Sequence, residues 1–509
     1  VPGQSTKRRS PWHFIGIILL AIFFASSFAA WWNLDRQPFS SIPISDRNIR
    51  SVAILPLKLL SEGEDNRSLS FGLTDSLITR LGSLNRFAVR PFNAVRIYAE
   101  SDQDPVAFGR VLKVDAVLDG TLQTDGDRMG VNLRLLDVRD GAQLWQDTFE
   151  VARRELFELQ DTISTKVTRS LTDDVLETDR RLLMKRHTEI PEAYQAYIRG
   201  RAIFDKKNPG NAEKAIDEYQ KAVALDPTFA LAYAGFADAF TRLARGLPPR
   251  EAGEVVGKAK AAANKALSLD PDLAEAHASL GLIKRLYDWD WSEAEKHFKR
   301  AIDLNPNYPN AHLWYAQLLA MVGRVDEALA EIKMAVEIDP LSPDAQAGRL
   351  AVLESRREYA EALTLAREFA DFDKERTLAR RGLATFLFHH GDYKQVIEIA
   401  EQDMPKYKVQ KYVWLSLLAT AYHRAGQAQQ SQERLSQLEE LAHTDSEALY
   451  SLAENYAELG RPIDAVAALE RCIELREERL AWLKVEPRFA SLVNEPRFHE
   501  ILKKMNLAG

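Results

Sequence analysis

The stretch Arg300–Pro306, RAIDLNP, decides the fold of this chain, because close copies of it recur along the sequence. The copies are KAVALDP ending at Pro227, KALSLDP ending at Pro271 and MAVEIDP ending at Pro340. Each phrase closes an amphipathic helix, and its proline cannot continue that helix because it lacks an N–H group. The last two intervals are about 35 residues, the length of a helix-turn-helix repeat. Such a pair cannot bury its apolar face alone, so the units must stack into a solenoid.

The phrases and their spacing resemble those of the tetratricopeptide repeat (TPR) family, which has Leu-Gly on the first helix and Ala, Phe, Ala and Pro on the second. The second unit carries additional residues around Gly246–Gly257, and weaker copies continue toward Cys472. We expect seven to nine units over residues 192–478, stacked into a right-handed solenoid. The third unit matches the pattern at Leu280, Gly281, Ala294, Phe298, Ala301 and Pro306.

The resemblance implies a concave groove that binds a protein or peptide ligand. Aligning the units places charged or polar residues of the first helices toward this groove, although each could instead be a solvated charge on a helix face. The positions of a TPR carboxylate clamp hold apolar residues or Gln317 here, so no clamp is expected. The candidate groove residues are Asp238, Arg242, Arg285, Gln317, Arg381, Arg424 and Glu454.

The turn region of the third unit contains three further features. Ser292 and Glu295 are spaced as a capping box that opens its second helix. The residues 288–291, Asp-Trp-Asp-Trp, predict a tight turn with both tryptophans packed inward, rather than a cation site. His277 and His312 occupy the same place in successive units; packed or hydrogen-bonded side chains are favoured there over a metal pair, because no third ligand has a suitable spacing.

Composition argues for an interaction protein rather than an enzyme. The chain has 509 residues and a net charge of −7, with both signs scattered along helices, so we expect no nucleic acid to be bound by this chain itself. No phosphate-binding loop, zinc-protease motif or nucleophile elbow is present in the sequence. The single Cys472 excludes an internal disulfide and falls at a small-residue packing position. We predict no catalytic residue, no cofactor and no metal.

The N-terminal sequence predicts a membrane anchor. Phe14–Trp32 is an uninterrupted apolar run that contains no charge or proline and is long enough to cross a bilayer. The basic residues Lys7–Arg9 precede it, which places the N-terminus in the cytoplasm and the remainder outside. A cleaved signal peptide is the alternative, because Ser27–Ala29 resembles a cleavage site. The expected location is the bacterial inner membrane, with residues 1–13 as a cytoplasmic stub and 33–48 as a tether.

Residues 49–178 predict a small α+β domain. Apolar residues at helical spacing alternate with short strand-like runs, and the Asp-Gly pairs at 125–126 and 140–141 are typical of tight hairpins. The expected order is β-α-β-α-β-β-β-α, with helices packed on one sheet. The strands are expected at 51–57, 86–89, 116–123, 130–138 and 143–151, and the helices at 70–81, 104–112 and 157–171.

This domain resembles the TolB-like (FlgO-like) domain that bacterial membrane regulators place before TPR arrays. The resemblance rests on SVAILPL at 51–57, FGLTDSLITRL at 71–81 and DRMGVNLRLLDVRDGAQLW at 127–145. The C-terminal helical cap expected at 479–509, with Pro-Arg-Phe at 487–489 and again at 496–498, is also similar to the ending of such chains. In these families a cytoplasmic effector precedes the membrane helix. It is most often a CadC-type winged-helix DNA-binding domain and sometimes a nucleotide cyclase.

Together these features predict a mainly α fold: a TPR superhelical solenoid, preceded by a small α+β domain and one N-terminal transmembrane helix. The expected function is non-enzymatic protein–protein interaction outside the cytoplasm, with the lipid bilayer contacted through Phe14–Trp32. The alternative is the sensory half of a one-component signalling regulator. Because residues 1–13 are too few to fold as an effector, that alternative requires a cytoplasmic effector domain or partner.

Overall fold

The computed structural model describes residues 47, 49–61, 63–84, 86–101, 103–172, 174–206, 208, 210–245, 247–372, 377–406 and 411–508. The chain divides into two compact units, Val1–Asn48 and Ile49–Gly509, and the elements below belong to the second. No helix among the described residues is both long and apolar enough to cross a bilayer. The anchor expected at Phe14–Trp32, with its stub and most of its tether, lies outside those residues.

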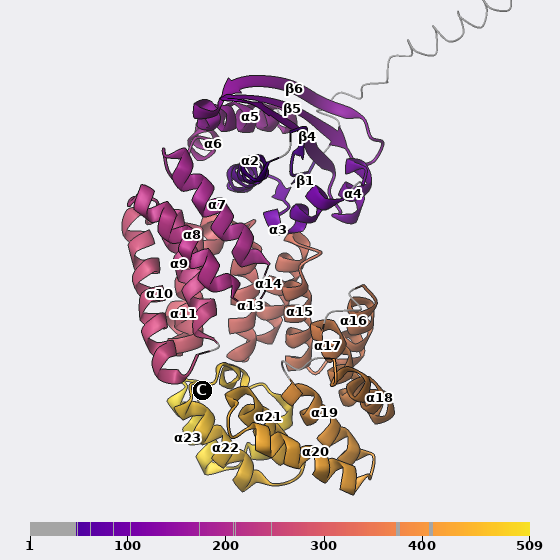
Figure 1. Ribbon diagram of the computed structural model, residues 1–509. Coiled ribbons are helices and arrows are strands. Elements are labelled where there is room, and N and C mark those ends of the chain that lie inside the picture. The colour runs from indigo at the N-terminus through magenta and orange to yellow at the C-terminus, as the bar shows by residue number, and fades with distance from the viewer. Residues whose placement is uncertain are drawn as a thin grey trace, which may run out of the picture. The chain divides into compact units, whose positions relative to one another are not determined.

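The first part of this unit is a mixed β-sheet with helices on one side (Figure 1). Its strand order is β3-β1-β4-β5-β6, and a short β2 pairs with β4. The first strands are parallel, whereas β4, β5 and β6 form antiparallel hairpins. Gly126 and Gly141 have positive φ angles at the two hairpin turns, as the Asp-Gly pairs predict. The strands are β1 Ser51–Ile54, β2 Lys58–Leu59, β3 Ala88–Val89, β4 Ala116–Asp125, β5 Arg128–Asp137 and β6 Gln143–Ala152.

Helices α2 (Glu64–Gly82) and α5 (Leu156–Leu171) bury their apolar faces against this sheet in one hydrophobic core. The order of elements agrees with the expectation, with β2, α3 (Phe92–Val95), α6 (Glu177–Leu183) and some 3-10 turns in addition. Asp104 caps α4 (Pro105–Val111) by accepting a hydrogen bond from the Ala107 N–H.

The solenoid contains eight helix pairs among the described residues, from Pro191 to Glu474. Its second helices meet the first through alanines with no exposed surface, such as Ala301 and Ala335. A Cβ atom on Gly281 would lie 2.7 Å from the Phe298 ring, so only glycine allows this approach. The pairs are α7/α8 (Pro191–Asp205, Asn211–Leu225), α9/α10 (Ala230–Ala244, Pro249–Leu269), α11/α12 (Ala274–Ile283, Trp291–Leu304), α13/α14 (Pro309–Met321, Val325–Ile338), α15/α16 (Pro343–Ser355, Tyr359–Phe372), α17/α18 (Thr377–His390, Tyr393–Asp403), α19/α20 (Lys411–Arg424, Ala428–Leu441) and α21/α22 (Ser446–Glu458, Pro462–Glu474).

The structure shows where one insertion lies, corrects one local expectation and supports another. The additional residues of the second unit lengthen α10 to 21 residues. The N-cap of α12 is Asp290, whose carboxylate accepts from the Glu293 N–H; the capping box at Ser292 is therefore wrong, because Ser292 already lies inside the helix. Trp289 and Trp291 are buried in the main hydrophobic cluster, as the predicted inward-facing turn requires.

The sheet domain packs directly on the solenoid through hydrogen bonds to main-chain carbonyls. The Tyr194 hydroxyl of α7 donates to the Gly72 carbonyl of α2 at 2.9 Å. The Asn307 amide donates to the Gly82 carbonyl at 2.9 Å, and Arg90 donates to the Glu337 carbonyl at 2.8 Å. These bonds connect residues that are far apart in sequence, so the domain lies beside the first four TPR units.

The C-terminal segment returns to the third TPR unit. It consists of the 3-10 turns η5 (Glu478–Trp482) and η6 (Pro487–Leu492) and the helix α23 (Pro496–Lys504), which we call the C-terminal cap. The Trp291 indole N–H donates to the Met505 carbonyl at 2.8 Å. Trp291 and the buried side chains of the cap belong to one hydrophobic cluster. The cap therefore connects the last TPR unit to the third (Figure 1).

Candidate functional site

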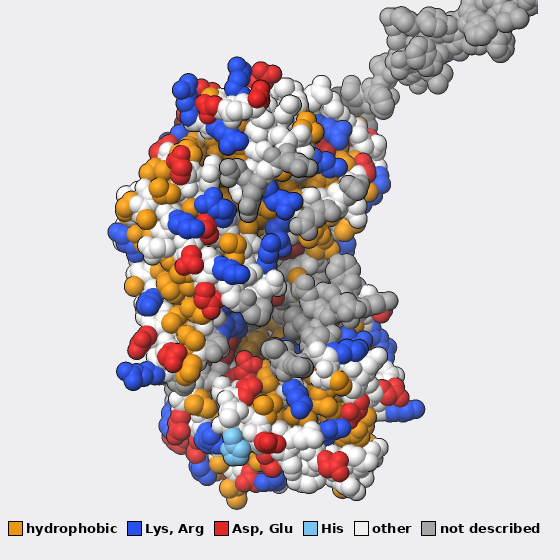
Figure 2. All heavy atoms as spheres, in the orientation of Figure 1, with side chains coloured by type: hydrophobic (Ala, Val, Ile, Leu, Met, Phe, Trp, Pro, Cys, Tyr) orange, Lys and Arg blue, Asp and Glu red, His pale blue; other side chains and the backbone are white. Residues whose placement is uncertain are grey.

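A cavity of ≈ 1270 Å³ lies on the concave side of the solenoid. Three parts of the chain form its wall: the sheet domain with Pro91 and Phe92, the first helices of the TPR units, and the cap with Arg479 and Arg488. In the space-filling view the surface is hollowed at mid-height, with acidic and basic side chains at the edge (Figure 2). Because neither histidine nor cysteine occurs among the described lining residues, the wall contains none of the Ser–His or Cys–His pairs used in nucleophilic catalysis.

Six of the seven candidate groove residues line this one cavity, and Arg424 does not. Arg424 is the last residue of α19 and forms an ion pair of 2.5 Å with Glu458, away from the cavity. Whether the six bind a ligand stays a prediction. They are Asp238 and Arg242 on α9, Arg285 just after α11, Gln317 on α13, Arg381 on α17 and Glu454 on α21.

Glu454 is held by two arginines of the C-terminal cap. Its Oε1 accepts from Arg479 at 2.6 Å and pairs with Arg488 at 2.7 Å, and its side chain is 1% exposed. Burial raises the pKa of Glu454, and the two guanidinium groups oppose that shift. Our groove alignment did not include the cap arginines. The feature of the sequence that points to Arg488 is the duplicated Pro-Arg-Phe, because its phenylalanines, Phe489 and Phe498, are both buried and hold the cap in place.

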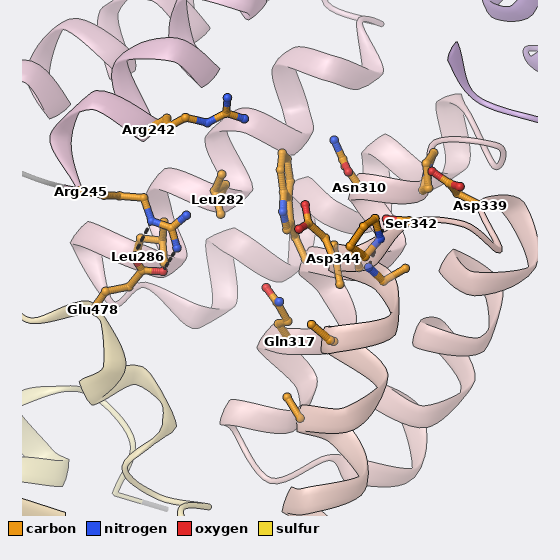
Figure 3. A pocket seen from close by; sticks show the side chains of 18 of the residues that line it. Arg242, Arg245, Leu282, Leu286, Asn310, Gln317, Asp339, Ser342, Asp344 and Glu478 are labelled. Atoms are coloured by element: carbon orange, nitrogen blue, oxygen red, sulfur yellow. Dashed lines mark hydrogen bonds and ion pairs between the residues drawn. The ribbon is translucent and has the colours of Figure 1, made fainter. Parts of the chain in front are cut away.

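A second ion pair joins the cap to the start of the solenoid. Arg245, which follows α9, binds both carboxylate oxygens of Glu478, with Nε at 2.6 Å from Oε2 (Figure 3). The Glu478 carboxylate and the Arg245 guanidinium carry opposite charges and neutralise each other. This pair therefore has no net charge, and the guanidinium of Arg285 is an additional positive charge beside it.

Arg242, Arg285 and Arg381 line the cavity without an ion-paired carboxylate among the described residues. Arg242 donates to the Phe204 carbonyl at 2.5 Å and lies over the Phe204 ring, and it is one of the cavity-lining side chains drawn in Figure 3. Burial lowers the pKa of Arg242 and of Arg381, and lowers that of Arg285 to about 10. The cavity wall thus holds guanidinium groups whose charge the protein only partly compensates.

The acidic side of the cavity surrounds Asp238. Its Oδ1 accepts from the Ser279 hydroxyl at 2.6 Å. Burial raises the pKa of Asp238 to about 7, and burial also raises the pKa of Glu275 nearby. These carboxyl groups hold their protons more tightly than in water, which reduces negative charge in the cavity near neutral pH.

The two histidines of successive TPR units do not contact each other. His277 Nδ1 lies 3.0 Å from His297 Nδ1, whereas His312 Nδ1 lies 2.7 Å from Glu331. The Nε2 atom of each faces the carbonyl of the proline six residues earlier, at 3.1 and 3.0 Å. Over the described residues, no group of three or more His, Cys, Asp or Glu side chains is arranged to hold a metal ion.

Family comparisons find both parts of this architecture. Residues 48–166 match the HilA/YgeH-like transcriptional regulator, second domain. Residues 285–350 and 446–479 match the tetratricopeptide repeat. The chain therefore contains TPR repeats, and its sheet domain is similar to the second domain of HilA-like regulators.

Two curated relatives each match more than half of this chain. The chain is 25% identical over 306 residues to "Putative adenylate cyclase 3" of Rhizobium meliloti, covering 58% of this chain and 44% of that protein. It is 23% identical over 304 residues to the transcriptional regulator HilA of Salmonella typhimurium, covering 59% of this chain and 53% of HilA. The chain thus spans about half the length of the curated relatives it matches.

Solved TPR structures resemble the chain only in part. The Cut9–Hcn1 complex of the APC/C is 14% identical with a TM-score of 0.41, covering 68% of this chain and 62% of that chain. Yeast Tom70 is 17% identical with a TM-score of 0.39, and the match covers 63% of this chain and 68% of Tom70. Pseudomonas aeruginosa PilF is 19% identical with a TM-score of 0.34, and the match covers 42% of this chain and 96% of PilF. Since these scores lie below 0.5, the TPR assignment rests on the sequence matches and the helix pairs.

Proposed function

We propose that this chain is a non-enzymatic, membrane-anchored TPR protein that binds an extended polypeptide segment of a partner outside the cytoplasm. The observation that carries the proposal is the cavity enclosed by the sheet domain, the first helices and the C-terminal cap. Its volume of ≈ 1270 Å³ exceeds the ~300–1,000 Å³ of ordinary small-molecule pockets. That volume suits a short extended segment and excludes a folded domain.

Selection of peptides on the full chain tests this function. A displayed library of random 12-residue peptides is selected against the wild type and against Ala351→Trp, which fills the cavity from α15. Ala261→Trp is the matched control, because Ala261 is exposed on α10 and lies outside the cavity. We expect enriched peptides to bind the wild type and Ala261→Trp equally and to lose binding to Ala351→Trp. Equal binding to all three proteins would refute the cavity as the binding site.

A second function is supported by the two curated relatives. One is named a putative adenylate cyclase and the other a transcriptional regulator, yet each matches more than half of this chain, so the two matches overlap. A region common to proteins with different named activities is better explained as an input module than as either activity. We propose that this chain, or a longer polypeptide containing it, receives a signal in the cavity and passes it to a cytoplasmic effector.

The effector proposal is tested at the DNA level. We expect the genomic sequence upstream of the Val1 codon, or a neighbouring gene, to encode a winged-helix DNA-binding domain or a nucleotide cyclase. A stop codon and ribosome-binding site directly upstream, with no effector gene adjacent, would exclude the regulator and leave the tethered interaction protein.

A further inference from the structure

Arg285 stands at an irregular point of the third TPR unit. It lies in a π-helical segment, Lys284–Asp288, that extends α11 and ends at Trp289 in a left-handed conformation with φ of 51°. The wider π turn interrupts the regular hydrogen bonding of a helix and occurs frequently at functional sites. Here it places Arg285 on the wall of the cavity.

The charge of Arg285 has little compensation from the protein. Its side chain belongs to a residue only 3% exposed, and its Nη1 donates to the Gln317 Oε1 at 2.7 Å. Its Nε is buried and has no hydrogen-bond partner in the described part of the chain. The carboxylate that attracts it, Glu478, is already bound through both oxygens by Arg245. The group formed by Arg245, Glu478 and Arg285 therefore carries one positive charge in excess.

We propose that Arg285 binds the carboxylate of an acidic residue on an extended peptide segment in the cavity. Gln317 assists it, because its Oε1 accepts from Arg285 and its amide N–H group donates to no residue that the structure describes. The inference rests on the proposed peptide-binding function and names the chemistry that the cavity recognises. It differs from a TPR carboxylate clamp, because apolar residues and Gln317 occupy the aligned positions where the clamp has Lys and Asn.

Charge complementarity favours an acidic segment over a basic one. A buried guanidinium that lacks a carboxylate is costly, and a ligand carboxylate would complete its hydrogen bonds in a shielded site. Burial also disfavours the anionic form of other carboxyl groups that line the cavity, such as Asp238. The acidic side chains that line the cavity therefore carry less negative charge than their number suggests, and they repel a ligand carboxylate less.

Thermal unfolding of the full chain tests whether Arg285 is a binding residue or a structural one. Arg285→Met keeps the length of the side chain and removes an uncompensated charge, so we expect its Tm to be equal to or about 1–3 °C above the wild type. Arg245→Met is the matched control. It removes the guanidinium that binds both carboxylate oxygens of Glu478 and should lower the Tm. A Tm of Arg285→Met that falls as far as that of Arg245→Met would overturn the proposal.

Peptide selection tests the ligand. Random 12-residue peptides enriched on the wild type should share one Asp or Glu position. Replacing that residue with Asn or Gln should weaken binding to the wild type about tenfold or more and leave binding to Arg285→Met unchanged, because the two changes remove one interaction. Enriched peptides without a shared acidic position, or effects that add independently, would overturn this proposal and leave the peptide-binding function intact. A selection that enriches no peptide would refute that function, and this proposal with it.

Discussion

Replacing Trp291 with phenylalanine is expected to loosen the C-terminal cap from the third TPR unit while the units themselves stay folded. Trp291 lies at the start of α12 and is 8% exposed. Its indole N–H donates to the Met505 carbonyl at 2.8 Å across more than two hundred residues of sequence. Phenylalanine preserves the aromatic packing in part and removes the donor.

The size of the effect follows from the two losses. A buried carbonyl left without its donor costs about 1–3 kcal/mol. The smaller ring leaves unfilled volume in a packed cluster, which adds about 1 kcal/mol. We therefore expect the docking of the cap to weaken by about 2–4 kcal/mol. The loss is local, because repeat units interact mainly with their neighbours.

Hydrogen exchange of the full chain measures this directly. Amides of residues 478–507 should exchange faster in Trp291→Phe, while those of α7 to α10 keep their protection. Trp314→Phe is the matched control: it removes the same atoms from a partly buried tryptophan that lines the cavity and makes no hydrogen bond to any described residue. Unchanged protection of the cap, or an equal loss in both variants, would refute the role assigned to the Trp291–Met505 bond.

Three further predictions concern the cavity, the packing and the membrane. The pKa of Asp238 is about 7 in the folded state against an ordinary 3.8, so its protonated form stabilises the protein at low pH and this stability is lost as the pH rises through 7. The variant Asp238→Asn cannot ionise, so urea unfolding should show it to be more stable than the wild type by about 1–4 kcal/mol between pH 5 and 8. Parallel pH profiles of the two proteins would contradict this. Ala301→Leu should overpack the contact with Ala278 and Ala311 at a cost of about 1–3 kcal/mol, and hydrogen exchange should locate the loss in the second to fourth units rather than throughout the array. A reporter that is active only in the periplasm should be active when fused after Gly509, whereas cytoplasmic reporter activity would exclude the proposed orientation.

The sequence predicted the cavity residues because each repeat orients its first helix in the same way. Asp238, Arg242, Arg285 and Gln317 follow from aligning the units, and all four line the cavity. Arg424 follows from the same alignment and lies elsewhere, because at the end of α19 its side chain reaches Glu458 of the next unit. The His277–His297 contact was missed for a related reason: we compared equivalent positions of successive units, and the partner stands on the other helix of the same unit.

What the sequence determined by itself is the local part of the architecture. Helix ends at proline, alanines and Gly281 at the helix crossings, and Asp-Gly hairpins each depend on residues close in the chain, so periodicity and turn chemistry are sufficient to predict them. Only the tertiary structure decided that the groove is closed by the sheet domain and the cap. That closure depends on the rotation accumulated over eight helix pairs, which brings Met505 to Trp291, and on the contact between Asn307 and Gly82. A small change in the angle between successive units is multiplied along the array, and no local pattern of residues encodes that angle.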